Sequence, residues 1–479
     1  MSTVGVPSFR RPASVWGQTA TPVPASPLSE TIPSPLDKIG FIFLILFIFF
    51  SYSRVLEFFL TGLRLQLIFS LLGLAAAVVS GRMLGCLRSP ITLWLFGLTG
   101  CMLVSVPLSA WPGASVGIIM DDWSKSFILF LTIVPLLATT SHVSRVISAA
   151  AIGSAVLPIL ALWIGEYSSG RLQMPAGQYG NPNDLATAIA MGVMLWVAIA
   201  ANPKSHKLMR IIGVLSMVPL MLVMMKTGSR AALFVLAAGM IVALANFSMM
   251  ARIKFLAGIT VLMLITMPFV SNDLLARFFV IFDGSKSTMD ERMEEEAIGS
   301  SESRLYLLEE SVKMTFRNPL LGVGVGQFAT VEAADARTEG RRGIWHGTHN
   351  TYTQISSETG FPGFICYVGV LVACWRSLSW VKRMNWSYSH PRKTEIASTV
   401  TALKLQLVTL AAAGCFAHFG YLWLVPAMAA LVCGLTLAAR REFSQLRPAG
   451  AAPAARAAQS PGLTGPPRRL IGLHAQARS

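Results

Sequence analysis

The chain has 479 residues, of which 53% are hydrophobic and 13% are charged. Soluble globular proteins carry about 25% charged residues, so this composition excludes an ordinary soluble enzyme and predicts an integral membrane protein. Much of the formal net charge of +16 lies in short segments between apolar stretches and in the C-terminal tail. That distribution is typical of cytoplasmic membrane loops and argues against nucleic-acid binding.

Residues 1–37 are rich in Pro, Ser and Thr, and we predict that they form a disordered cytoplasmic tail. About twelve apolar stretches follow that are long enough, or nearly so, to cross a bilayer as helices. The predicted fold is therefore all-α and polytopic, with nine spans in residues 38–270 and three in residues 361–439. The predicted spans are 38–55, 65–80, 91–108, 123–139, 144–164, 183–201, 208–226, 231–248, 252–269, 361–379, 400–419 and 421–438.

Lys and Arg gather in alternate connections, and this asymmetry predicts the orientation of the chain. The opposite connections are poorer in positive charge, and one carries Asp121 and Asp122. Because positively charged loops stay in the cytoplasm, we expect both termini there, including a disordered basic tail at residues 440–479. The long polar segment 271–360 then faces outward, which we interpret as the periplasmic side of a bacterial inner membrane.

The polar segment 271–360 has several parts. An acidic run at residues 291–296 fits a solvated helix face, and Arg304 to Phe316 has apolar residues at helical spacing, which predicts an amphipathic helix. Asn318-Pro319 is expected to end that helix. Glycines at 322, 324 and 326 then alternate with valines, a pattern that allows a sharp bend or a close backbone approach.

Five short motifs connect the chain to a known family. In chain order they are Gly-Asn-Pro-Asn at 180–183, Thr-Gly-Ser-Arg at 227–230, Pro-Leu-Leu-Gly-Val-Gly at 319–324, His-Asn-Thr-Tyr at 349–352 and Glu-Thr-Gly at 358–360. Over about residues 165–375, the chain resembles the O-antigen ligase and polysaccharide polymerase superfamily of bacterial envelope glycosyltransferases. Each motif alone is weak, but their order and their placement relative to the spans are specific.

The resemblance implies a transfer reaction. A glycan on a polyprenyl diphosphate, such as undecaprenyl diphosphate, moves to an acceptor hydroxyl at the outer membrane face, with inversion and without a metal or other cofactor. The acceptor is lipid A-core sugar in a ligase and the end of another lipid-linked glycan in a polymerase. The implied partners are donor, acceptor and membrane lipid, with other polysaccharide export proteins as further candidates; nucleic acid is not among them.

Three arginines are candidates for binding the diphosphate, because a guanidinium group binds two phosphate oxygens at once. Arg230 lies at the outer mouth of the eighth predicted span, where the positive-inside rule does not account for it. Its alternative role is contact with lipid headgroups. Arg304, at the start of the amphipathic helix, and Arg171, in the loop before the sixth span, are the other two; surface ion pairing is the alternative for Arg304.

His349 is the favoured base or acceptor-positioning group, because a neutral imidazole accepts a proton near pH 7. Glu358 is expected to orient His349 or to bind sugar hydroxyls, with a partner for the N-terminus of the next helix as the alternative. An interfacial aromatic is the alternative for Tyr352. The remaining predicted substrate contacts are Asn350, Tyr352, Gly322 and Gly324.

Two further groups and a second function complete the prediction. His346 precedes His349 by three residues, but no third ligand is evident, so no metal site is expected. Asn183 is predicted to cap the sixth span, and Asp184 is an interfacial carboxylate without an assigned partner. The alternative function is a transporter or flippase for lipid-linked glycans, which predicts ionisable residues near mid-bilayer. The predicted spans carry almost no charge in their middles, which favours the transferase.

Overall fold

The computed structural model describes residues 35–202, 205–271, 274, 291–388 and 390–446. Within these residues the regular structure is nearly all helical, and the sheet is a two-stranded hairpin of β1(Glu166–Ser168) and β2(Arg171–Gln173). Most of both predicted tails lies outside the described residues. The last helix continues to Ser444, so residues 440–444, which the sequence analysis assigns to the tail, are helical.

Each of the twelve predicted apolar segments coincides with a helix. Nine helices of the described part are long and apolar enough to cross a membrane, and two more apolar helices, α3 and α11, are shorter. The all-α polytopic fold is therefore confirmed in outline, and the number of spans stays a prediction. The helices are α1(Pro35–Ser53), α3(Leu65–Val79), α5(Pro90–Ser105), α7(Ser124–Leu136), α8(Thr140–Ile164), α9(Pro182–Ala200), α10(Lys207–Lys226), α11(Arg230–Asn246), α12(Met249–Thr266), α16(Thr351–Ser387), α17(Lys393–Ala413) and α18(Leu424–Ser444).

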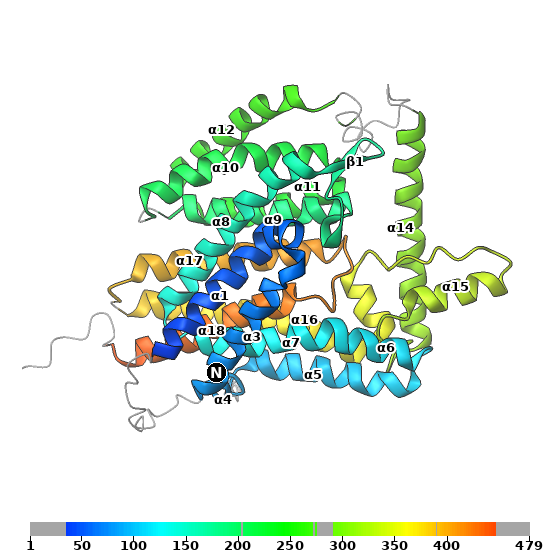
Figure 1. Ribbon diagram of the computed structural model, residues 1–479, viewed down its shortest axis with the longest axis horizontal. Helices are drawn as coiled ribbons and strands as arrows, with labels where there is room; N and C mark the ends of the chain where they lie inside the picture. The colour runs from blue at the N-terminus through cyan, green and yellow to red at the C-terminus, as the bar shows by residue number, and fades with distance from the viewer. Residues whose placement is uncertain (1–34, 203–204, 272–273, 275–290, 389, 447–479) are drawn as a thin grey trace, which may run out of the picture.

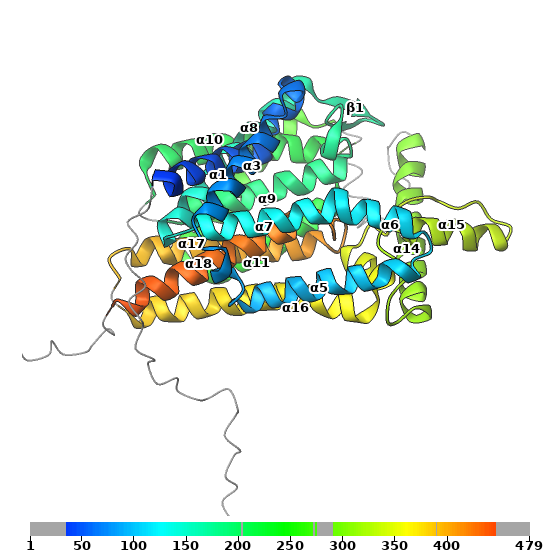
Figure 2. The ribbon, with the colours of Figure 1, turned by 60° about the horizontal axis from the view of Figure 1, so that its bottom comes forward.

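Other helices connect the long helices or cover the ends of the bundle. They are α2(Val55–Phe59), α4(Met83–Cys86) and α6(Pro112–Ile118), with α14(Glu291–Arg317) and α15(Phe328–Thr338) between α12 and α16. Figures 1 and 2 show the long helices running side by side, while α14 crosses one end of the bundle at a steep angle and α15 projects beyond it. We call the end that α14 crosses the loop end.

Burial divides the bundle into a centre and an edge. Helices α9 and α18 bury most of their residues, including Trp196, which is fully buried. Helix α12 buries only Thr266 and lies at the edge of the bundle (Figure 1). An apolar helix that leaves most of its side chains exposed needs another apolar surface around it, and the hydrocarbon of a membrane supplies one.

Helix α14 is longer than the predicted amphipathic helix, and most of its apolar residues at the predicted spacing are not on its buried side. It begins at Glu291, so the acidic run and the amphipathic stretch form one helix. Leu305 and Phe316, two of the apolar residues at the predicted helical spacing, are 68% and 69% exposed, whereas Leu307 and Met314 are buried. The protein-facing side also carries small polar residues, and the hydroxyls of Thr315 and Ser356 lie 2.8 Å apart. The exposed apolar residues at the predicted spacing are therefore available to contact another surface.

Helix α16 consists of two helices joined at a kink. Gly360 has φ +71° and ψ −175°, and Pro362 follows it. The part before the kink, predicted as the end of the polar segment, is helical, and residues 354–360 are all buried. This short buried helix carries the His-Asn-Thr-Tyr and Glu-Thr-Gly motifs into the loop end of the bundle.

The glycine-rich segment packs against the first part of α16. The Val323 amide donates to the Ser357 carbonyl at 2.8 Å, and the Gly324 amide donates to the Glu358 carbonyl at 3.1 Å. Gly322 and Gly324 have φ of +66° and +104°. A Cβ on Gly322 would overlap the Glu358 backbone, and one on Gly324 would overlap Ser109. These glycines therefore allow a close approach of backbone to backbone.

We predict that Gly322→Ala destabilises the protein strongly, because the new methyl group meets backbone that cannot move aside. Gly340→Ala is the matched control, since Gly340 has a similar φ of +71° but open space around its Cα. Thermal unfolding in detergent should show a clearly larger loss for Gly322→Ala than for Gly340→Ala. Equal losses would mean that only the backbone conformation, and not the packing against α16, matters at this position.

Candidate functional site at the loop end

His349 is held at the entrance of α16 by its neighbours. It has φ +49°, a left-handed conformation that is uncommon outside glycine but tolerated by histidine. Asn350 is the N-cap of α16, and its side-chain oxygen accepts from the amides of Tyr352 at 2.9 Å and Thr353 at 3.2 Å. The cap fixes the end of the helix and with it the position of the imidazole. An uncommon backbone conformation beside a cavity is also typical of functional residues.

The loop between α17 and α18 is bonded to the same entrance. The Thr351 amide donates to the Gly414 carbonyl at 2.7 Å, and its hydroxyl donates to the Ala417 carbonyl at 2.7 Å. The Tyr352 hydroxyl donates to the Ala411 carbonyl at 2.8 Å. This loop brings the His418 ring to 5.1 Å from the His349 ring, centroid to centroid. His418 thus joins the site from a distant part of the sequence.

Arg230 is positioned by the two upstream motifs, which meet at the loop end. Arg171 donates from Nε to the Thr227 carbonyl and from a terminal nitrogen to Asn183 Oδ1, each at 2.8 Å. Ser229, the N-cap of α11, donates to the same Asn183 oxygen at 2.9 Å. Arg230 follows as the first residue of α11. Arg171 lies on the β-hairpin rather than in an irregular loop.

The predicted helix cap at Asn183 is wrong by two residues. Asn181 is the N-cap of α9, and its side-chain oxygen accepts from the Asn183 amide at 2.8 Å. Pro182 occupies the first helical position. An amide hydrogen there would have no acceptor within the helix, so a proline at this position loses no hydrogen bond. The Asn183 side chain is therefore available to join Arg171 to Ser229.

Two cavities at the loop end share Arg304 and His349. The first has a volume of ≈ 380 Å³ and adds Arg230 and Asn350 to these two, with walls made of Ala231, Phe234, Leu305, Leu308 and Phe416. The second has a volume of ≈ 340 Å³ and adds Arg171 and His346 together with Asn181, Asn183 and Ser303. Three arginines and a histidine from four separate parts of the chain therefore converge.

The electrostatics of these cavities favour an anion. Burial, and then the positive charge of Arg230, lower the pKa of the Arg304 guanidinium, while Asp184 acts in the opposite direction. Burial lowers the pKa of His349 to about 3, with His418, Arg304 and His346 adding to the effect. His349 is thus a neutral imidazole beside two arginines, and a bound anion would relieve the repulsion between their charges.

Glu358 lies elsewhere, beneath the glycine-rich segment. Its carboxylate is buried and accepts from the Gly326 amide at 2.8 Å, the Phe328 amide at 3.3 Å and the Tyr421 hydroxyl. Phe328 begins α15, so the carboxylate is a partner for the N-terminus of that helix rather than of the next span. Glu358 therefore orients the backbone of the site rather than a sugar.

The structure divides the predicted site residues into two groups. Arg171, Arg230, Arg304, His349 and Asn350 line the two cavities. Glu358, Tyr352, Gly322 and Gly324 are not among the lining residues and hold the surrounding backbone instead. His418 is not among the residues predicted from the sequence, although a histidine close to aromatic and glycine residues in the short connection 414–423 is a signal for it.

A sequence model of the O-antigen ligase family matches residues 214–368. This part of the chain is O-antigen ligase-like. The matched residues include Arg230, Arg304 and His349, whereas Arg171 lies before them in the sequence. No curated protein matches the chain. The expected family is thus confirmed, and it indicates glycosyl transfer in a membrane, of ligase or polymerase type, between lipid-linked glycan donors and their acceptors.

We predict that Tyr421→Phe loosens the backbone of this O-antigen ligase-like site. The change removes one donor from the buried Glu358 carboxyl group, and a hydrogen bond contributes about 0.5–1.5 kcal/mol to stability. Limited proteolysis should cleave the α14–α16 region faster than in the wild type, and the thermal midpoint should fall. Tyr167→Phe is the control, because its hydroxyl is exposed and accepts a hydrogen bond from Lys226 rather than donating to a buried carboxylate. If Tyr421→Phe matched that control, the Glu358 contact would not stabilise the site.

We also predict a pH dependence of stability from His349. The imidazole of an unfolded chain has a pKa of about 6.5, and the folded value is lowered to about 3. Between these values the unfolded chain binds the proton and the folded chain does not, so stability falls as pH falls through this window. His349→Asn, which tolerates the positive φ, should lose less thermal stability than the wild type between pH 7 and pH 5. Parallel losses in the two proteins would contradict the lowered pKa.

Proposed function

We propose that the protein is an inverting membrane glycosyltransferase. It moves a glycan from a polyprenyl diphosphate to an acceptor hydroxyl at the periplasmic face of the bacterial inner membrane, as an O-antigen ligase or a polysaccharide polymerase. The observation that carries this proposal is the cavity in which Arg230 and Arg304 lie together with His349. The O-antigen ligase match over the same residues supports it.

The donor fits the two kinds of surface in this cavity. A diphosphate carries several negative oxygens, and Arg230 and Arg304 supply guanidinium groups that bind such oxygens in pairs. The apolar walls, which include Phe234, Leu305 and Phe416, suit the hydrocarbon of a polyprenyl chain. Leu305 also belongs to the exposed apolar side of α14, which crosses the end of the bundle where a membrane surface would lie (Figure 1).

The reaction forms one bond to the anomeric carbon and breaks another. The acceptor oxygen attacks that carbon from the side opposite the diphosphate, so the configuration inverts. The bond between the anomeric carbon and the phosphate oxygen breaks, and its electron pair leaves with the diphosphate, whose growing charge Arg230 and Arg304 stabilise. The acceptor hydroxyl gives its proton to His349, which returns it to solvent. The step as written balances without a metal ion.

Binding of the donor also changes the pKa of His349, the proposed base. A histidine whose pKa is about 3 accepts protons poorly. An anionic diphosphate beside His349 favours the charged imidazolium and offsets the effect of Arg304, so it raises the pKa towards neutrality. Under this proposal the base becomes effective only when the leaving group is bound, which limits transfer of the glycan to water.

The orientation rests on the distribution of Lys and Arg. The connections at the end opposite the loop end carry most of the basic residues, among them Arg82, Arg145 and Arg210, and such connections stay in the cytoplasm. The loop end then faces the periplasm. A donor glycan that has crossed the membrane and an acceptor on the outer leaflet would both reach the site from that side.

The second candidate is a transporter or flippase for lipid-linked glycans, and Lys404 is the observation in its favour. Helix α17 begins seven residues before the predicted span, so Lys404 lies near its middle. Its Nζ lies 4.5 Å from the centroid of the Trp375 ring and 3.0 Å from Ser379 Oγ. A charge at this depth is costly and often functional. The cluster of arginines and His349 at one end of the bundle still favours surface chemistry.

We predict that purified wild-type protein transfers glycan from a lipid-linked donor, and that Arg230→Ala and Arg304→Ala each reduce the rate by about 10²–10³-fold, as expected for loss of a group that stabilises developing charge. His349→Ala should reduce it by about 10²–10⁴-fold. The assay separates products into glycosylated lipid A-core and lengthened lipid-linked glycan, which distinguishes ligase from polymerase.

Lys226→Ala is the matched control for these arginines. Lys226 is a cation at the same end of the bundle, but its contacts are with Tyr167. It should keep near wild-type activity. Movement of the lipid-linked glycan across vesicles without any transfer product would contradict the transferase and support the flippase. Full activity in folded Arg230→Ala and His349→Ala would show that the reaction takes place elsewhere.

A further inference from the structure

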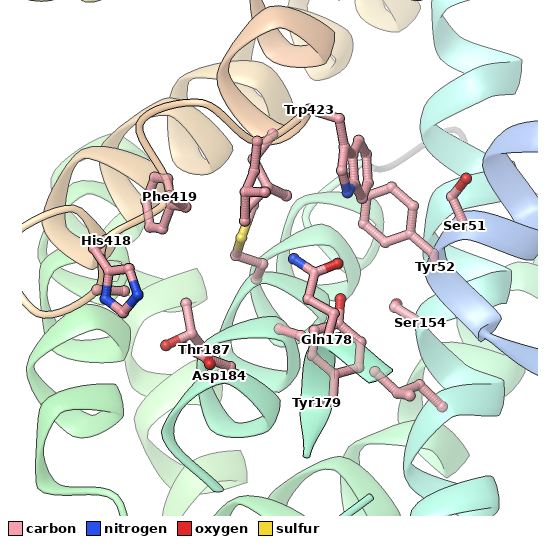
Figure 3. A pocket seen from close by; sticks show the side chains of 16 residues that line it. Ser51, Tyr52, Ser154, Gln178, Tyr179, Asp184, Thr187, His418, Phe419 and Trp423 are labelled. Atoms are coloured by element: carbon pink, nitrogen blue, oxygen red, sulfur yellow. The ribbon is translucent and has the colours of Figure 1, made fainter. Parts of the chain in front are cut away.

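A third cavity at the loop end lies outside the group of arginines. It has a volume of ≈ 140 Å³ and is lined by the end of α1, the turn before α9, the first turns of α9 and the connection between α17 and α18. Figure 3 shows the labelled side chains around it, with His418 on one side and Trp423 and Tyr52 on the other. His418 also contacts His349, so this residue links the cavity to the proposed base.

Several polar groups in this cavity have no hydrogen-bond partner among the described residues. They are the Asp184 carboxylate, the Gln178 amide and the hydroxyls of Tyr52 and Tyr179, whereas the nearby Thr187 hydroxyl bonds the Asn183 carbonyl. Buried or half-buried polar groups are normally satisfied by protein, water or ligand. Four such groups around one cavity therefore indicate a ligand with several hydroxyl or amide groups.

The remaining walls are aromatic. The rings of Tyr52 and Trp423 meet edge to face with centroids 5.9 Å apart, and Phe419 and Tyr179 complete the lining. Aromatic faces combined with a few hydrogen-bonding groups fit a ligand that is apolar on its faces and polar at its rim. A pyranose ring has that character, with C–H groups on its faces and hydroxyls around its edge.

Other ligand classes fit less well. The described lining has no lysine or arginine, so nothing there would bind a phosphate or nucleotide. A lipid tail would leave the Asp184 carboxylate and the Gln178 amide without partners, which is costly. An engineered cavity of about 150 Å³ binds benzene in another protein, so the volume here suits a single six-membered ring.

We propose that this cavity is the acceptor-sugar subsite, which holds one pyranose ring of the acceptor glycan. This inference rests on the proposed function. Asp184 accepts hydrogen bonds from the ring hydroxyls, Tyr52 and Trp423 contact a face of the ring, and the reacting hydroxyl of the acceptor projects past His418 to His349. The same ring chemistry occurs in lipid A-core and in a lipid-linked glycan, so the test uses a probe from each source.

The first test measures binding without turnover. The full-length protein in detergent is titrated, by saturation-transfer NMR, with core oligosaccharide released from lipopolysaccharide and with oligosaccharide released from the polyprenyl carrier. At least one probe should saturate the wild type, and Asp184→Asn should weaken its binding about tenfold, which corresponds to about 1.4 kcal/mol. Gln178→Ala, a change in a half-exposed turn outside the hydrophobic core, should weaken it in the same direction.

Asp121→Asn is the matched control, because Asp121 is an exposed carboxylate near the loop end that pairs with Lys125. It should bind the probes as the wild type does. The subsite proposal is overturned if neither probe saturates the folded wild type, or if Asp184→Asn and Gln178→Ala both bind like Asp121→Asn.

A second measurement separates sugar binding from a purely electrostatic role of Asp184 beside Arg304. In the transfer assay, Asp184→Asn should raise the KM for the acceptor about tenfold and leave the KM for the donor unchanged. A change confined to the donor KM would overturn the subsite. Probe binding that persists in Arg230→Ala supports the subsite independently of transfer, whereas a wild type that binds sugar but never transfers it would contradict the proposed function alone.

Discussion

The site depends on one buried carboxylate, Glu358, and the backbone that it holds. A buried carboxylate is strongly destabilising unless its oxygens are hydrogen-bonded, so its donors cannot easily be replaced by water. Those donors come from the glycine-rich segment, from the start of α15 and from Tyr421 in the connection before α18. Glu358 itself lies about two turns along α16 from the entrance that carries His349. One side chain on α16 is therefore bonded to two regions that are distant in the sequence, residues 326–328 and Tyr421.

This arrangement explains why arginines can converge at the end of a membrane bundle. Arg230 is fixed by the cap of α11 and by the contacts of Arg171, while Arg304 is carried by α14 across the bundle end. Rigid backbone keeps these like charges close to one another before any ligand is bound. A bound anion relieves the repulsion between the two guanidinium groups. Because this positive potential exists before the ligand binds, the cavity is suited to a diphosphate leaving group.

The sequence predicts much of the fold, because hydropathy is a local property and a helix satisfies its own backbone in lipid. It also predicts Arg230 and His349, which lie in ordered motifs, and Arg304, which starts the amphipathic stretch. It does not predict that Glu358 faces the glycines or that His418 touches His349, since both depend on contacts between distant segments. Apolar spacing predicts that α14 is amphipathic but not which side packs against the protein, because its protein-facing residues include serine and threonine.

The role of this cavity is tested most directly by an experimental structure of the protein in lipid with a polyprenyl-diphosphate glycan bound. We expect the diphosphate to lie within hydrogen-bond distance of both Arg230 and Arg304, the polyprenyl chain to leave past Phe234 and Leu305, and the anomeric carbon to face His349. A diphosphate bound at the opposite end of the bundle, or along the helix that carries Lys404, would contradict it.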